Sequence, residues 1–201
     1  MKRVLPLFSY LFHPIFIPLY TAAVFFYTDD NYLHASDKLL VMFQIVIMTV
    51  LIPIAFFFLL KTLGRIDSVM ASDVAHRKIP LALQVILLSV LIFQSVTPSR
   101  IPELFFFFCA AILTSVAALV AAFAELKPSL HMAAIGAMLV FIIGTSIHNH
   151  ENMIAIIALI FVVTGLVASS RLEMNAHSNH ELFFGFLIGV IPQFAFWSYW
   201  L

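Results

Sequence analysis

Residues 104–124 read LFFFFCAAILTSVAALVAAFA, a run of 21 residues without one charged side chain. A helix needs about 20 predominantly apolar residues to cross the hydrocarbon core of a bilayer. The chain contains seven such uncharged stretches, 19 to 25 residues long: 4–28, 39–60, 79–99, 104–124, 128–150, 152–170 and 182–201. The sequence therefore predicts an all-α, polytopic transmembrane helix bundle.

The composition excludes a separate soluble domain. Hydrophobic residues make up 63% of the 201 positions, with only ten basic and ten acidic side chains. An ordinary soluble domain is about 25% charged. Because the linkers between the stretches are short, we expect one integral membrane domain over 1–201. The formal net charge of zero gives no indication of a nucleic-acid partner.

The first stretch, 4–28, leaves the number of spans at six or seven. Pro6, Pro14 and Pro18 interrupt the hydrogen-bond ladder of a helix there, although helices in membranes tolerate proline better than soluble ones. The stretch either crosses the membrane, or is re-entrant or lies in the interface, which would leave six spans.

If all seven stretches cross the membrane, the polar segments between them alternate between its two faces. Six basic residues then fall on one face and two on the other: Lys61, Arg65, Arg77, Lys78, Lys127 and Arg171 against Lys38 and Arg100. Cytoplasmic segments carry an excess of lysine and arginine, so the face richer in bases is predicted to be cytoplasmic. Bases that bind a ligand do not report topology, however.

A histidine and a carboxylate lie four residues apart on the richer face. Residues at this spacing share one face of a helix, so Glu181 is able to accept a hydrogen bond from one ring nitrogen of His177. The other nitrogen is then free to act as a base or as a nucleophile. His131, at the start of a different apolar run, is a candidate for the second proton-transfer group.

Cations accompany these histidines in three separated segments of the same face. Arg77 and Arg171 carry the guanidinium fork that suits phosphate oxygens. Ionisable groups at membrane depth are costly and usually mark a site. Two histidines, a carboxylate and several cations indicate phosphoryl transfer, for which no metal or other cofactor is needed.

Residues 170–185 read SRLEMNAHSNHELFFG, which resembles the third signature of the type 2 phosphatidic acid phosphatase superfamily, SR-x5-H-x3-D-x3-G, with glutamate for aspartate. Residues 128–131, PSLH, resemble the second signature, PSGH, with leucine for glycine. Residues 70–80, MASDVAHRKIP, resemble the first, K-x6-RP, but methionine stands at the lysine position and two residues precede the proline. The resemblance covers about 61–189.

The resemblance implies a membrane phosphatase acting on a lipid phosphate or diphosphate at the bacterial inner membrane. It implies that His177 forms a phosphohistidine, Glu181 orients it, and His131 protonates the leaving alkoxide. The family usually works at the outer face, against the charge count above, so the side of the membrane stays open. Phosphate binding is implied for Arg77, Arg171, Ser129 and Ser170, with Lys78 or Lys127 in place of the missing lysine.

Three alternatives follow from the same residues. An inactive relative would keep the phosphate pocket and act as a lipid-binding or transport protein. Leu130 favours this alternative, because the glycine that it replaces in the signature lets a loop approach an oxyanion closely. A small transporter would use the histidines as a proton relay. A metal site is conceivable at 148–151, where His148, His150 and Glu151 cluster, because imidazole and carboxylate suit zinc. The oligomeric state is not predicted.

Overall fold

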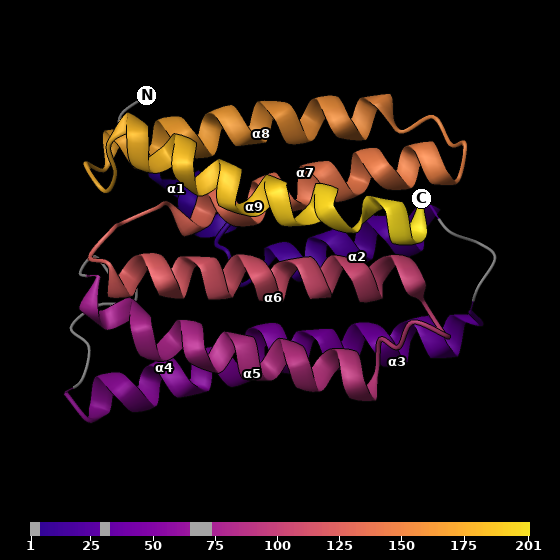
Figure 1. The fold of residues 1–201 in the computed structure, drawn as a ribbon, viewed down its shortest axis with the longest axis horizontal. Helices are drawn as coiled ribbons and strands as arrows, with labels where there is room; N and C mark the ends of the chain where they lie inside the picture. Colours follow the sequence, from indigo (N-terminus) through magenta and orange to yellow (C-terminus); the bar gives the residue numbers. More distant parts are fainter. Residues whose placement is uncertain (1–4, 29–32, 65–73) are drawn as a thin grey trace.

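The computed structural model describes residues 5–28, 33–64 and 74–201. These ranges contain helices and no strand, which confirms the predicted all-α class. Arg65 and Met70, considered above for charge sorting and for the first signature, lie outside the described residues. The helices, shown in Figure 1, are α1 (Leu5–Leu11), α2 (Ile17–Thr28), α3 (Ala35–Val46), the π-helical η1 (Ile47–Leu51), α4 (Ile52–Thr62), the short η2 (Ala75–Arg77), α5 (Lys78–Gln94), α6 (Pro102–Phe123), α7 (Leu130–His148), α8 (Ile154–Glu173) and α9 (Asn179–Trp200).

Five helices in the described part of the chain are long and apolar enough to cross a membrane. One is the continuous 28-residue helix Ala35–Thr62, which joins α3, η1 and α4, and the others are α6, α7, α8 and α9. The apolar helices α2 and α5 are shorter, with 12 and 17 residues. Large hydrophobic side chains such as Phe43, Phe58, Val120, Leu159 and Phe184 are exposed, as expected of lipid-facing helices. The architecture is compatible with an integral membrane protein.

Helix α7 lies at the centre of the bundle. It packs against α2, α6, α8 and α9, and most of its residues are buried. Small residues make this possible: the ring of Phe186 lies over Gly136, and the ring of Trp200 lies over Gly144. Close packing at small residues is what holds helices together in lipid.

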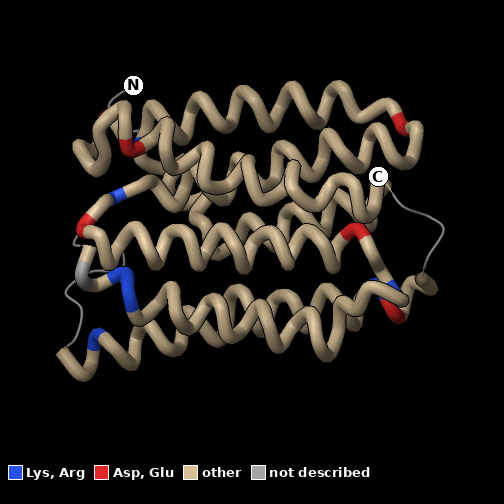
Figure 2. The backbone as a smooth tube through the Cα atoms, in the orientation of Figure 1, with Lys and Arg blue, Asp and Glu red and all other residues tan. Residues whose placement is uncertain are grey.

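Charged residues gather at the two ends of the bundle, with an uncharged middle (Figure 2). At one end Lys78 Nζ lies 3.0 Å from Glu125 Oε1, and at the other Arg100 lies 3.5 Å from Asp37. This distribution is compatible with a membrane protein, because charges are costly in the hydrocarbon layer.

Two of the predicted stretches fold differently from a simple 20-residue span. The stretch 4–28 forms two helices with a break at 12–16, because Pro14 lacks an N–H and restricts the residue before it. Pro18 is accommodated in the first turn of α2, where N–H groups have no helical partner. The stretch 79–99 forms a helix only as far as Gln94, ahead of Pro98.

Helix α9 approaches α7 at two glycines, so closely that no side chain fits. A Cβ atom at Gly185 would lie 2.7 Å from the backbone nitrogen of Ser129, and one at Gly189 would overlap the carbonyl oxygen of Ala133. The GxxxG pair therefore serves packing within the chain, and it holds the start of α9 against the start of α7.

We expect Gly189→Ala to destabilise the protein by about 1–3 kcal/mol, because the added methyl group meets backbone that has to move. Thermal unfolding in detergent measures the change. The matched control is Gly165→Ala in α8, where a Cβ atom has nothing within 4 Å. Equal unfolding temperatures for the two variants would contradict the close approach of α7 and α9.

Candidate functional site

The turn between α8 and α9 is defined by its hydrogen bonds. Asn175 adopts a left-handed φ of 50°, a conformation that asparagine tolerates well. Its N–H donates to the Leu172 carbonyl (2.9 Å), and the Ala176 N–H donates to the Arg171 carbonyl (3.1 Å). This pair of bonds is a Schellman motif. It ends α8 and sets the five-residue interval between Arg171 and His177.

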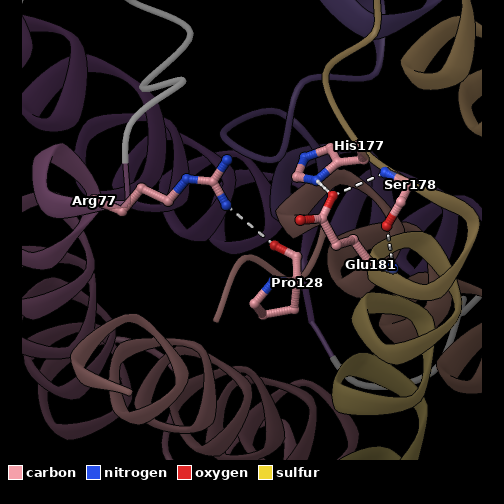
Figure 3. Close-up of polar contacts among 5 residues, drawn as sticks. All are labelled: Arg77, Pro128, His177, Ser178 and Glu181. Carbon is pink, nitrogen blue, oxygen red and sulfur yellow. Dashed lines mark hydrogen bonds and ion pairs between the residues drawn. The ribbon is translucent and has the colours of Figure 1, made fainter. Parts of the chain in front are cut away.

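A capping box begins α9 on the other side of this turn. The Ser178 N–H donates to Glu181 Oε2 (2.8 Å), and the Glu181 N–H donates to Ser178 Oγ (3.4 Å). The same Oε2 atom lies 3.2 Å from Nδ1 of His177 (Figure 3). Because an ionised carboxylate only accepts, Nδ1 carries the ring hydrogen and the lone pair of neutral His177 lies on Nε2.

The turn at 128–131 connects this histidine to the start of α5. Nη1 of Arg77 donates to the Pro128 carbonyl (3.1 Å), and Figure 3 shows its guanidinium directed toward that carbonyl. The Ser129 N–H donates to the backbone carbonyl of Glu181 (2.9 Å). The three segments that carry the signature-like residues are thus bonded to one another.

Four of the predicted catalytic and phosphate-binding residues line one cavity of about 280 Å³. They are Arg77, His131, Arg171 and His177, and all four are buried. The rest of the cavity wall is mostly apolar and comes from α2, α4, α5, α6 and α7. It includes Ile17, Ile54, Leu81, Phe107, Ala111 and Ala137.

His177 is neutral at physiological pH. Burial lowers its pKa to about 4, helped by the positive charges of Arg77 and Arg171, while Glu181 acts in the opposite direction. A neutral imidazole that lines one cavity with two guanidinium groups combines an available lone pair with sites for anionic oxygens. That combination suits attack on a phosphoryl group.

The remaining predicted residues lie around the cavity but not in its wall. Ser170 is buried and its hydroxyl lies 2.6 Å from that of Ser9, while Ser129 Oγ is buried with no hydrogen-bond partner in the described ranges. Lys78 pairs with Glu125 and also lies over the Phe123 ring. Lys127 is half-buried and attracts Glu181 electrostatically.

The first stretch adds two residues, His13 and Ser9, that the sequence did not predict to belong to the site. His13 lines the cavity, and the Ser9 carbonyl lies 3.0 Å from Nε2 of His131. The sequence did contain a signal, since Pro14 and Pro18 interrupt an apolar run and a histidine lies at the interruption. Non-helical backbone at membrane depth is tolerated where it lines a cavity.

At the opposite end, His148 does not cluster with His150 and Glu151. Its Nε2 lies 3.5 Å from Glu103 of α6, and its ring packs on Trp200. Within the described residues, no three histidine, cysteine, aspartate or glutamate side chains gather in a way that could hold a metal ion.

Comparison with known proteins gives no match: no family model fits the chain, and none was found among curated proteins or solved structures.

Titration of the histidines by ¹⁵N NMR in detergent should find the His177 ring neutral, with hydrogen on Nδ1, down to about pH 4. Arg77→Met removes a positive charge and should raise this pKa, whereas Glu181→Gln removes a negative one and should lower it. A wild-type His177 that titrates at the ordinary value of 6.5, unmoved by Arg77→Met, would contradict this electrostatic account.

Proposed function

We propose that this protein is an integral membrane phosphatase that hydrolyses a lipid phosphate or lipid diphosphate through a phosphohistidine, without a metal ion. The observation that carries the proposal is the cavity, in which two arginines and the histidines continue into an apolar wall. An amphiphile with an anionic headgroup matches both parts. The resemblance to the type 2 phosphatidic acid phosphatase superfamily supports the same reaction.

In the proposed reaction, Nε2 of His177 attacks phosphorus and the bond to the leaving oxygen breaks. His131 in its protonated form gives its Nδ1 proton to that oxygen, since Nε2 donates to the Ser9 carbonyl. The lipid alcohol, or the lipid monophosphate from a diphosphate, then leaves. Water then attacks the phosphohistidine, His131 takes up the proton of the water, and inorganic phosphate leaves. Arg77 and Arg171 bind the non-bridging oxygens, over which the negative charge is spread in the transition state.

We further propose that the chain crosses the bacterial inner membrane seven times. The helices α1 and α2 form one broken crossing and α5 forms a short one, in addition to the five long apolar helices. This arrangement places the turns before α5, α7 and α9 at one membrane face, as the bonds of Arg77 to Pro128 and of Ser129 to Glu181 require.

Purified protein in detergent should release inorganic phosphate from phosphatidic acid or from a polyprenyl diphosphate, and His177→Ala should reduce that rate at least about a hundredfold. The matched control is His34→Ala, because His34 is exposed and makes no side-chain cap bond at α3. Release that survives His177→Ala would contradict the phosphohistidine mechanism.

Further arms of the same assay separate the alternatives. Activity that persists in EDTA and is inhibited by vanadate supports the proposed chemistry. Activity lost in EDTA and restored by zinc or magnesium would contradict it. Binding of phosphatidic acid without any release would identify a lipid-binding or transport protein, and gain of release in Leu130→Gly would assign the missing turnover to that leucine.

If the chain crosses the membrane seven times, the side on which each introduced cysteine can be labelled is fixed. In a Cys109→Ser background, cysteines at positions 2 and 125 should react with a membrane-impermeant reagent on one side, and cysteines at 151 and 201 on the other. Comparison of intact cells with inverted vesicles measures this and assigns the site to one face. A cysteine at position 2 that reacts on the side of position 151 would contradict the seventh crossing.

A further inference from the structure

The break between α1 and α2 brings a third histidine to the cavity. The residues at the break, His13, Pro14 and Ile15, all line the cavity wall. In a continuous helix the backbone groups would be hydrogen-bonded within the helix, and only one face of it would line the cavity. The proline break interrupts the helix and leaves the side chain of His13 in the cavity wall.

Two hydrogen bonds made by Ser9 hold α1, just before the break, against the helices of the proposed site. The hydroxyl of Ser9 lies 2.6 Å from that of Ser170, the neighbour of Arg171. Nε2 of His131 lies 3.0 Å from the Ser9 carbonyl, which can only accept, so His131 donates there. Ser9 therefore connects the end of α1 to both α7 and α8, four residues before His13.

The environment of His13 determines where its hydrogen lies. The Ile15 N–H donates to Nδ1 of His13 (3.4 Å), so Nδ1 is the acceptor and Nε2 carries the ring hydrogen. The ring packs edge-to-face on His131, with centroids 5.2 Å apart and an interplanar angle of 83°. Arg171 is close enough to act on His13 electrostatically. His13 is thus a hydrogen-bond donor on a wall shared with two guanidinium groups.

We propose that His13 is a further substrate-binding residue, whose Nε2–H donates a hydrogen bond to a phosphoryl oxygen of the bound lipid phosphate. The inference rests on the proposed function and adds a contact from outside the three signature-like segments. It also gives the break in the proposed first crossing a role, because the residues at the break form part of the wall of the anion site.

A donor to a phosphoryl oxygen acts on substrate and transition state alike, so its loss should appear mainly in KM. In purified protein, His13→Ala should raise the KM for phosphatidic acid and the inhibition constant of dodecylphosphonate about tenfold or more, with a smaller effect on kcat. His13→Gln keeps an N–H donor and should recover most of the affinity. The control His34→Ala should change neither constant.

A spectroscopic measurement separates ligand contact from a packing role. In ¹⁵N-histidine-labelled protein, the Nε2 resonance of His13 should shift as dodecylphosphonate saturates the site. This readout does not depend on His13→Ala folding normally.

The outcomes are distinguishable. A wild-type protein that binds and hydrolyses, together with a folded His13→Ala variant of unchanged inhibition constant or an Nε2 resonance that does not move, overturns this inference alone. A wild-type protein that neither binds dodecylphosphonate nor releases phosphate overturns the proposed function and this inference together.

Discussion

A single carboxylate oxygen, Oε2 of Glu181, accepts from the Ser178 N–H and from Nδ1 of His177. The first bond caps α9. The second fixes the ring hydrogen of His177 on Nδ1, which leaves the lone pair on Nε2, the proposed nucleophile. The backbone carbonyl of the same residue accepts from Ser129. The start of α9, the tautomer of the proposed nucleophile and the position of the 128–131 turn therefore depend on one residue. Glutamate suits this role because the N3 position of a capping box takes a glutamate or glutamine side chain.

The second constraint is the close approach of α9 to α7. Gly185 lies over Ser129 and Gly189 over Ala133, so the two helices that carry His131 and Glu181 start from nearly the same place. Lipid provides no hydrophobic force between helices, and packing of this kind takes its place. The site is thus a product of the bundle's packing: segments far apart in the sequence meet because their helices begin at one end.

Helix class was predictable because uncharged runs of about 20 residues have few other folds available to them. The grouping of Arg77, His131, Arg171 and His177 at one end was accessible as an expectation, because alternating crossings return the chain to the same face. The contribution of residues 4–28 to the site was not predictable from the sequence. The prolines there indicate a break, but the contact between Ser9 and His131, 122 positions apart, depends on how α1 and α2 pack against α8 and α7. Side-chain direction was also out of reach: Lys78 faces Glu125 instead of the cavity.

The central claim is that His177 carries the phosphoryl group on the nitrogen that Glu181 leaves free. Rapid-quench mass spectrometry of the protein turning over phosphatidic acid tests it directly, under alkaline conditions that preserve phosphohistidine. The account predicts phosphate on Nε2 of His177, formed and lost at rates compatible with turnover. Phosphate release with no phosphorylated histidine, or with the phosphoryl group on Nδ1, would contradict it.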